Sequence, residues 1–355
     1  MTLWRPMAVP QTFRRLMVNR ITYKFREACS IESVKTPKLG ENDMLVKTRF
    51  VGINASDVNF SAGRYDPSKK PPFSTGFEGL GEVVQKGSNV TLPLSQPVAY
   101  MSYGAFGEYH VINQREAIPL PVMNKEFLSL LVSGLTAGIS LEKTGEIKKG
   151  ETVLVTAAAG GTGQFAVQLA KITGCHVIGT CSTDSKAALL KELGCDRVVN
   201  YQKENLGDVL RKEYPRGVDV VYESVGGEMF DTCVNNLAQN GRLIVIGWIS
   251  GYQSSKGFAT SKTSSSLPQR LLPKSASIRG FFLFNHSREI KPTAMKLFEL
   301  YTANKLKCLI DNGVNSDKGP FLGLESIFDA VDYLYSKNSI GKIIVEIPSV
   351  PGSKL

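Results

Sequence analysis

The spacing of hydrophobic and polar residues changes along the chain. Up to about residue 137, short apolar runs are separated by turns, without long helical patterns between them. This spacing predicts a small β-barrel or β-sandwich. Its predicted strands are Leu16–Ile21, Met44–Gly52, Gly79–Val84, Pro97–Met101 and Phe106–Ile112.

From about Leu135 a helical pattern begins, and strands then alternate with helices at βαβ intervals. The alternation predicts a doubly wound parallel sheet of six strands. The predicted strands are Val153–Thr156, His176–Thr180, Arg197–Asn200, Val218–Ser224, Leu243–Gly247 and Ser277–Phe282. The first helix between them is predicted to end at Gly174. The next three are predicted at Ser185–Leu193, Lys203–Glu213 and Met229–Gln239.

After a predicted helix at Glu289–Ala303, the last segment carries a helical pattern at Leu324–Tyr335 and a strand pattern at Ile343–Ile347. This segment has no strand partner near it in sequence, so we expect it to return to the N-terminal domain. The predicted divisions are therefore 1–137, 138–303 for the nucleotide-binding domain, and 304–355 for the returning segment and tail.

The strand at Val153 leads directly into a glycine-rich turn, Ala158-x-Gly160-x-x-Gly163. Gly160 and Gly161 would let the backbone approach a pyrophosphate, and Gly163 would let the next helix lie close to the sheet. An ordinary tight turn is the alternative, but the strand before and the helix after favour dinucleotide binding. The predicted sheet-facing stripe of that helix is Phe165, Ala166, Leu169, Ala170 and Ile172.

The end of the second predicted strand indicates which dinucleotide binds. NAD-preferring sites place an acid about 20 residues past the glycine turn, whereas Thr180, Cys181 and Ser182 stand there. Ser182 and Lys186 would instead suit a 2′-phosphate, so NADPH is the predicted cofactor. Asp184 could pair with Lys186, and Lys186 could also be an ordinary exposed lysine.

Composition is that of a globular protein, with 42% hydrophobic and 21% charged residues among 355. The net charge of +10 is compatible with anionic ligands. No block of five or six basic residues occurs, so we expect no nucleic-acid partner. No run of about 18 apolar residues occurs, so we expect no membrane span.

The six cysteines are scattered and form no C-x-x-C pair, which is typical of free thiols in a reducing compartment. The three histidines form no ligand motif with them. We therefore expect no protein-built zinc site.

Two targeting signals compete. Ser353-Lys354-Leu355 is the peroxisomal address, and it predicts the peroxisomal import receptor as a partner and the peroxisome as the location. The stretch from Met1 to Arg26 carries basic residues and no acid, as in a mitochondrial presequence. Leu16 and Val18 alternate with other residues as a strand would, so we favour the peroxisome.

Several separated motifs resemble those of one family. They are NASDVNFSAGRY, GFEGLGEV, TAGISL, VTAAAGGTGQFAVQLAK, GCDRVVNY and VDVVYESVGG. Over essentially its whole length the chain resembles a medium-chain dehydrogenase/reductase of the quinone reductase and prostaglandin reductase branch. The resemblance implies an α/β fold with a Rossmann domain plus a GroES-like β-barrel catalytic domain, and a possible homodimer.

Zinc-dependent members of that family carry a ligand cysteine and a ligand histidine at places where this sequence has Asn54 and Phe77. The cysteine-rich lobe for a structural zinc is also missing. The resemblance therefore implies a zinc-independent enzyme.

The chemistry implied is NADPH-dependent reduction of the conjugated C=C bond of enone lipids, including 15-oxo-prostaglandin 13-reductase activity. Hydride goes to the β-carbon, and hydrogen-bond donors stabilise the enolate. Tyr252 and the cofactor ribose hydroxyl are the implied donors, and Asn54 and Tyr65 could line the substrate pocket. Quinone reduction is one alternative, and a non-catalytic structural, RNA-binding or regulatory protein that keeps NADPH is another.

Between the last two predicted strands, Tyr252–Ser266 is rich in Ser, Gly, Thr and Lys and is either a lid beside the cofactor or a surface loop. The resemblance also implies a set of cofactor contacts. They are Gly160, Gly161, Thr162, Gly163, Ser182, Lys186, Tyr201, Ser224, Ile246, Tyr252, Phe281, Phe282, Leu283 and Asn338.

Overall fold

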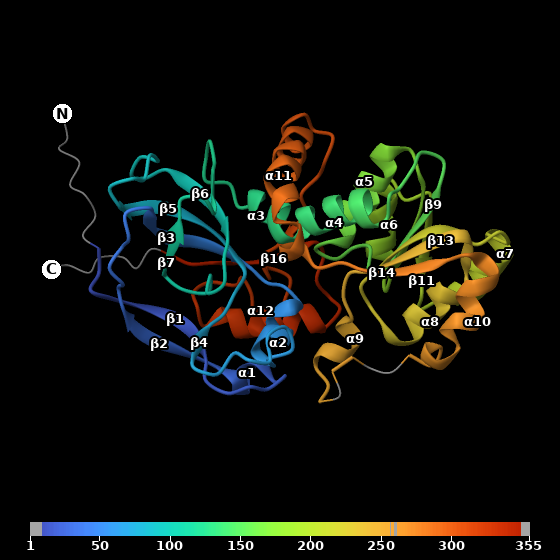
Figure 1. Cartoon of the computed structure of the whole chain (residues 1–355), viewed down its shortest axis with the longest axis horizontal. Helices are drawn as coiled ribbons and strands as arrows, with labels where there is room; N and C mark the ends of the chain where they lie inside the picture. Colours follow the sequence, from blue (N-terminus) through green and yellow to red (C-terminus); the bar gives the residue numbers. More distant parts are fainter. Residues whose placement is uncertain (1–8, 256, 259–260, 349–355) are drawn as a thin grey trace. The chain divides into compact units, whose positions relative to one another are not determined.

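The computed structural model describes residues 9–255, 257–258 and 261–348, and the chain forms two compact units (Figure 1). The antiparallel unit contains residues 1–131, 311–339 and 343–355, and the parallel unit contains 132–310 and 340–342. The predicted divisions after residues 137 and 303 therefore both fall inside the parallel unit. The Ser-Lys-Leu address lies outside the described residues, so the peroxisomal location stays a prediction.

The parallel unit is built on one six-stranded sheet of order β11-β10-β9-β12-β13-β14. All neighbouring strands run parallel, and the chain order reverses between β9 and β12. This confirms the predicted doubly wound sheet. The strands are β9 (Thr152–Val155), β10 (His176–Cys181), β11 (Arg197–Asn200), β12 (Val218–Glu223), β13 (Leu237–Val245) and β14 (Ser277–Gly280).

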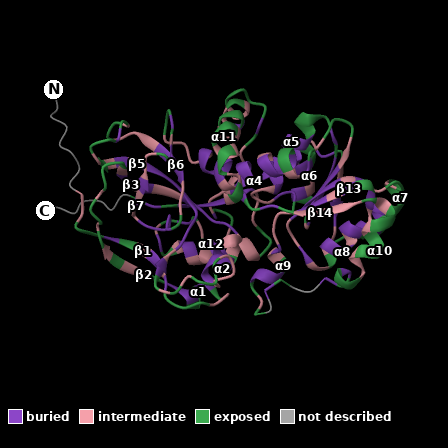
Figure 2. Ribbon diagram, in the orientation of Figure 1, coloured by how far each residue is buried: buried purple, intermediate pink, exposed green. Residues whose placement is uncertain are grey.

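The central strands are buried, as their apolar runs predicted. Val153, Leu154 and Val155 of β9 are fully inaccessible, and buried residues follow the sheet in Figure 2. Helices cover both faces, with α5 (Gly163–Thr173) against β9 and β10, and α8 (Gly227–Asn235) against β12 and β13. The other helices of this unit are α4 (Leu135–Ile139), α6 (Asp184–Glu192), α7 (Leu206–Glu213), α9 (Ile249–Tyr252), α10 (Leu267–Leu271) and α11 (Ser287–Thr302).

The predicted buried stripe of α5 holds except at its end. Phe165, Ala166 and Ala170 are fully buried and Leu169 nearly so, but Ile172 is 50% exposed. The whole last turn, residues 171–174, is exposed, so no sheet lies beneath it. Ile172 was therefore wrongly assigned to the core.

The largest boundary error concerns α8 and β13. The predicted helix Met229–Gln239 ends at Asn235, and β13 already begins at Leu237, which pairs with Val218. The register shifts between Val218 and Val220, and Asn240 takes a φ of 60°. This irregularity interrupts the alternation by which the start of a strand is detected.

The antiparallel unit has one seven-stranded and one three-stranded sheet. Strand β16 pairs with β3, Ile344 opposite Gly52, which confirms that the C-terminal segment returns to the N-terminal domain. Strands β2, β4, β8 and β15 were not predicted. The strands are β1 (Thr12–Val18), β2 (Cys29–Lys35), β3 (Asp43–Gly52), β4 (Phe73–Ser74), β5 (Glu78–Lys86), β6 (Pro97–Met101), β7 (Tyr109–Asn113), β8 (Ala117–Pro119), β15 (Ile310–Asp311) and β16 (Lys342–Glu346). The helices associated with this unit are α1 (Phe25–Ala28), α2 (Ser56–Ser61), α3 (Phe127–Ser129) and α12 (Ser326–Tyr335).

The described part of the basic N-terminal stretch belongs to this unit's fold. Arg14 lies in β1 and forms an ion pair with Glu108 at 2.9 Å. Arg26 lies in α1 and pairs with Asp329 and Asp332 of α12 at 2.5 and 2.6 Å. These side chains tie segments distant in sequence together.

Among the described residues, no helix combines the length and the apolar character that a membrane crossing requires.

Gly163 should be intolerant of a side chain. A Cβ there would lie 2.4 Å from the Ala157 oxygen and 2.8 Å from the Ala158 Cα. We expect Gly163→Ala to lower the free energy of unfolding by about 1–3 kcal/mol, since backbone would have to move. Urea unfolding followed by the fluorescence of Trp248, in the same unit, measures this.

Gly280 provides the matched control, because a Cβ there would meet nothing within 4 Å. Gly280→Ala should change the same free energy by less than about 0.5 kcal/mol. Equal losses in both variants would contradict the close approach at Gly163.

Candidate active site

The predicted cofactor contacts of the parallel unit lie where its strands end. All six strands run in one direction, so their carboxyl ends share one edge of the sheet. In open α/β sheets ligands bind outside this edge, where the strand order reverses. The residues following the strand ends are Gly160–Gly163 after β9, Ser182 and Lys186 after β10, Tyr201 after β11, Ser224 after β12, Ile246 and Tyr252 after β13, and Phe281–Leu283 after β14.

The glycine turn is shaped by contacts of its own backbone. The Gly160 amide donates to the Ala157 oxygen at 2.9 Å, and Thr162 is the N-cap of α5. Gly160 and Gly341 form an isolated parallel bridge, so the Gly161 amide faces the Gly341 oxygen, and the amides of Thr162 and Gly163 stand at the start of α5. Amides at a helix N-terminus suit a pyrophosphate, as the motif predicted.

Lys186 lies in the first turn of α6, where the 2′-phosphate contact was predicted, but it is more buried than the sequence indicated. The side chain is only 8% exposed, and its backbone amide donates to Oγ1 of Thr183, the N-cap of α6, at 3.3 Å. The Asp184 carboxylate accepts hydrogen bonds from Asn200 at 3.0 Å and from Lys203 at 2.5 Å, and it forms no ion pair with Lys186. Lys186 is therefore neither an ordinary exposed lysine nor the partner of Asp184.

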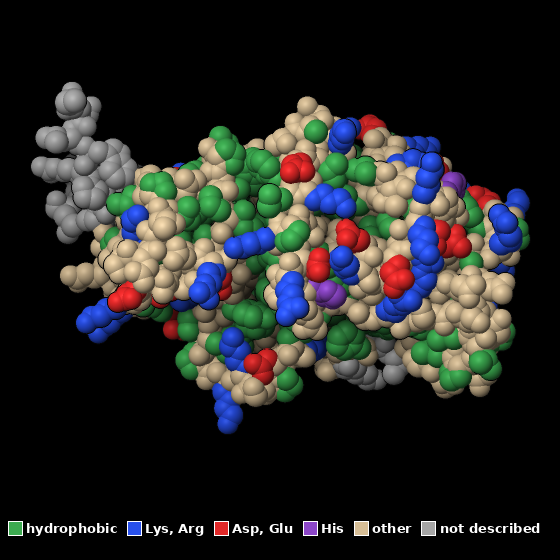
Figure 3. All heavy atoms as spheres, turned by 45° about the horizontal axis from the view of Figure 1, so that its top comes forward, with side chains coloured by type: hydrophobic (Ala, Val, Ile, Leu, Met, Phe, Trp, Pro, Cys, Tyr) green, Lys and Arg blue, Asp and Glu red, His purple; other side chains and the backbone are tan. Residues whose placement is uncertain are grey.

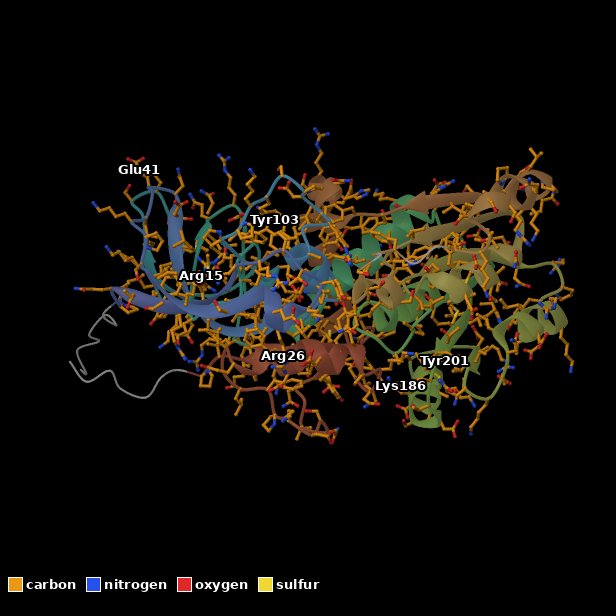
Figure 4. The ribbon with its side chains drawn as sticks, turned by 90° about the horizontal axis from the view of Figure 1, so that it is seen from below. Arg15, Arg26, Glu41, Tyr103, Lys186 and Tyr201 are labelled. Atoms are coloured by element: carbon orange, nitrogen blue, oxygen red, sulfur yellow. The ribbon has the colours of Figure 1, made fainter. Side chains whose placement is uncertain are left out.

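Tyr201 lies beside the same corner. Its amide donates to the Cys181 oxygen at 3.0 Å, which places the end of β11 against the end of β10. Figure 4, which labels Tyr201 and Lys186, shows both side chains at the same end of the parallel unit. Ser182 directly follows β10, four residues before Lys186, so all three predicted 2′-phosphate contacts lie at the ends of β10 and β11.

Three residues near the glycine turn were not foreseen. A Cβ on Gly161 would lie 3.1 Å from Ser133 Oγ and 3.6 Å from the Cδ of Lys342, which is 2% exposed. Gly341 reaches the turn as well, since its amide donates to the Ala159 oxygen at 2.8 Å. These residues come from elsewhere in the chain, so the local sequence gave no signal for them.

The predicted site residues also omit Glu223, although it lies inside the motif VDVVYESVGG. It is fully buried and accepts hydrogen bonds from the amides of Val225 and Gly226 and from Thr156 Oγ1, at 2.9, 3.0 and 3.4 Å. Burial raises the pKa of this carboxyl to about 7, against the opposing effect of those donors. Glu223 thereby fixes the loop that carries Ser224.

Ser224 and Ile246 follow neighbouring strands and are both partly buried. The Ser224 amide donates to Thr156 Oγ1 at 2.9 Å, and the Ile246 amide donates to the Glu223 oxygen at 2.7 Å. Their positions are therefore set by the strand ends.

Tyr252 ends the short helix α9 and is 5% exposed. Its hydroxyl oxygen accepts the Trp248 amide proton at 2.7 Å. This bond fixes the Tyr252 hydroxyl beyond the carboxyl end of β13, at the place where the donor role was predicted. The rest of the predicted lid includes residues 256, 259 and 260, which lie outside the described part of the chain.

Phe281, Phe282 and Leu283 continue from β14, and the Phe281 amide donates to the Val245 oxygen at 3.1 Å. Phe281 and Leu283 are buried, whereas Phe282 is 37% exposed. Of the three, Phe282 therefore offers most surface to a ligand.

Asn54, Tyr65 and Asn338 belong to the antiparallel unit. Asn54 is buried before α2, and its amide nitrogen donates to Glu78 Oε1 at 3.0 Å and to the Gly52 oxygen at 3.2 Å. Tyr65 follows α2, and its hydroxyl accepts from Asn59 at 3.3 Å. Asn338 is exposed and follows α12.

Asn54 and Phe77 do not fit a zinc ion. An amide and an aromatic ring stand where cysteine and histidine would be needed, and Phe77 packs on Phe60 and Tyr103 with ring centroids 5.4 Å away in each case. Across the described residues, no group of three or more His, Cys, Asp or Glu side chains could hold a metal ion. All six cysteines are free.

Two family descriptions match the two parts of the chain. Residues 40–122 match the alcohol dehydrogenase GroES-like domain, and residues 161–299 match the zinc-binding dehydrogenase family. The first lies within the antiparallel unit and the second within the parallel unit.

The chain is 54% identical to prostaglandin reductase-3 of Mus musculus over 98% of this chain and 93% of that protein. It is 42% identical to a probable quinone oxidoreductase of Leishmania amazonensis over 96% of this chain and 100% of that protein. The solved Escherichia coli quinone oxidoreductase in complex with NADPH is similar with a TM-score of 0.79 and 26% identity, over 94% of this chain and 99% of that one. The chain therefore belongs to the medium-chain dehydrogenase/reductase superfamily, as its motifs indicated, with prostaglandin reductases and quinone oxidoreductases among its relatives.

Proposed function

We propose that the protein reduces the conjugated C=C bond of enone lipids with NADPH, and that 15-oxo-prostaglandins are among its substrates. The observation that carries this is the pair Asn54 and Phe77, which leaves the usual metal-ligand places of the superfamily without zinc donors. Alcohol–ketone chemistry in this superfamily needs such a Lewis acid, whereas enone reduction needs only hydrogen-bond donors at the carbonyl oxygen. The likeness to prostaglandin reductase-3 supports the same reaction.

The cofactor assignment rests on this chain's own donors. The glycine turn Gly160–Gly163 would lie against the pyrophosphate, with the Thr162 and Gly163 amides as donors, and Lys186 with Ser182 and Tyr201 would hold the 2′-phosphate. When bound, the nicotinamide supplies the hydride. The Escherichia coli relative is a complex with NADPH, which supports the choice of cofactor.

Tyr252 is the residue we propose to meet the charge that develops on the carbonyl oxygen. A phenol held by a backbone amide is positioned before the reaction, so little reorganisation is needed at the moment of reaction. Asn54 and Tyr65 are proposed to line the substrate pocket. Asn54 is positioned by Glu78, and Tyr65 by Asn59.

Quinone reduction is the second candidate, favoured by the 42% identity to the probable quinone oxidoreductase. Quinones are also conjugated acceptors, so the same donors could serve. A nucleic-acid-binding role is less well supported, because on the face drawn in Figure 3 Lys and Arg are interspersed with Asp and Glu and form no single basic patch.

Oxidation of NADPH should be measured with a 15-oxo-prostaglandin, with a simple quinone and with no acceptor, and the lipid product identified by mass spectrometry. We expect a gain of two hydrogens in the prostaglandin at C13–C14. Oxidation of NADPH by the quinone alone would refute the enone reaction, and oxidation by neither would favour a non-catalytic role.

Lys186→Ala should weaken NADPH binding by about tenfold to a hundredfold and leave NADH binding almost unchanged. One charge-assisted contact, worth about 1.5–3 kcal/mol, is lost to a phosphate that NADH lacks. Titration calorimetry with both cofactors measures this. Lys191→Ala, which removes an exposed lysine from the same helix, is the control and should change neither affinity. Equal losses for NADPH and NADH would contradict the assignment.

Tyr252→Phe should lower kcat about a hundredfold while the Kd of NADPH stays within about twofold, since the proposed donor to the carbonyl oxygen is removed. The control is Tyr214→Phe. Tyr214 follows α7, and its hydroxyl is hydrogen-bonded to His176 at 2.8 Å. Melting temperatures of both variants show whether the lost Trp248 contact has loosened the fold. A folded Tyr252→Phe protein with normal kcat would remove Tyr252 from the mechanism.

A further inference from the structure

Four aromatic rings gather in the antiparallel unit around Phe60 of α2. Phe73 and Phe77 meet the Phe60 ring edge-on at 5.3 and 5.4 Å, and Tyr103 stacks on it at 4.9 Å with an angle of 11° between the rings. We call these four residues the aromatic platform. Phe60, Phe73 and Phe77 are buried, but Tyr103, labelled in Figure 4, is 41% exposed, so the platform has an open side.

Lys69 places its ammonium group on this platform. Its Nζ lies 4.6, 4.9 and 5.3 Å from the ring centroids of Phe60, Phe73 and Tyr103. Contacts of this kind hold a cation electrostatically on an aromatic face, and an ammonium group with three N–H bonds need not use all of them there. Lys69 therefore has a defined place and retains donors for another group.

Within the part of the chain that the structure describes, no carboxylate forms an ion pair with Lys69. The salt bridges of the antiparallel unit use Arg14, Lys24, Arg26 and Arg49 instead. Asp66 acts on Lys69 only from a longer distance, and its Oδ1 accepts from the Ser68 hydroxyl and amide, at 2.5 and 3.1 Å. A partly buried cation beside apolar rings, with no ion-pair partner, is an arrangement that suits an anionic amphiphile.

The platform adjoins the residues already placed at the substrate. Phe77 is followed directly by Glu78, which accepts the hydrogen bond from Asn54 at 3.0 Å. Phe60, which lies under Lys69, is the next ring from Phe77. The Lys69 ammonium is thus separated from Asn54, a predicted pocket residue, by the rings of Phe60 and Phe77. This position suits the end of an extended substrate that is remote from the reacting bond.

We propose that Lys69 and the aromatic platform bind the carboxylate and adjoining chain of an acidic lipid, so that the preferred substrates are enone fatty acids rather than neutral enones. The inference rests on the proposed enone reduction and names its substrate class. The rings would cover the chain, and the ammonium would pair with the carboxylate.

The test compares a 15-oxo-prostaglandin free acid with its methyl ester at saturating NADPH. For the wild-type protein we expect a KM for the acid about tenfold to a hundredfold below that for the ester, at similar kcat. Lys69→Gln should raise the KM of the acid to that of the ester and leave the ester unchanged, and Lys69→Arg should restore most of the preference. Lys70→Gln, at the exposed neighbouring lysine, is the control and should behave as wild type.

Equal KM values for acid and ester in the wild-type protein, or an acid preference that survives Lys69→Gln, would overturn the inference while leaving enone reduction intact. Loss of both substrates in Lys69→Gln with a lowered melting temperature would mean that Lys69 only holds its loop to the platform, which also overturns it.

A binding measurement separates this inference from the proposed reaction. Calorimetry with dodecanoate and with dodecanol, in the presence of NADP⁺, needs no turnover. We expect dodecanoate to bind wild type about tenfold more tightly than Lys69→Gln, and dodecanol to bind both equally. If neither acid nor ester is reduced but this difference appears, the proposed function fails and the anionic subsite stands; if it does not appear, the subsite fails.

Discussion

The parallel alignment of six strands is the constraint on which the rest of the cofactor site depends. Parallel strands end together, so one edge of the sheet collects residues from positions 160 to 283. The reversal of strand order between β9 and β12 opens this edge at its middle, beside the glycine turn. The phosphate donors, Ser224 and Tyr252 owe their common location to this arrangement rather than to contacts among themselves.

Sequence reasoning succeeded where local pattern determines structure. The run at β9, the glycines after it and the stripe on α5 specify strand, turn and helix within about 20 residues, and no long-range pairing is needed to recognise them. Lys186 was proposed in the same way, from its distance to the turn. Its burial was not, because that depends on how α6 packs on the sheet. The prediction that Ile172 faces the sheet was wrong for a similar reason, since the hydrophobic pattern does not show where the sheet beneath the helix ends.

The antiparallel unit was less predictable because its contacts join distant segments. Strands β4 and β15 have only two residues each, too few for an alternation to appear. The aromatic platform takes rings from α2, from β4 and from either end of the β5–β6 hairpin, and nothing in their spacing announces that they meet. Glu223 was visible in a motif, but its hydrogen bonds to Val225 and Gly226 follow from a turn that only the fold defines.

The pairing of β16 with β3 has a consequence for assembly of the chain. Gly52 and Ile344 are partners about 290 residues apart, and the whole parallel unit lies between them. During synthesis the stretch 132–310 leaves the ribosome as one piece and can collapse on itself, while the end of β3 at Phe50–Gly52 lacks its partner β16. The antiparallel unit is thus completed only after the parallel unit has been synthesised, and a chain cut before β16 would leave an open sheet edge prone to association.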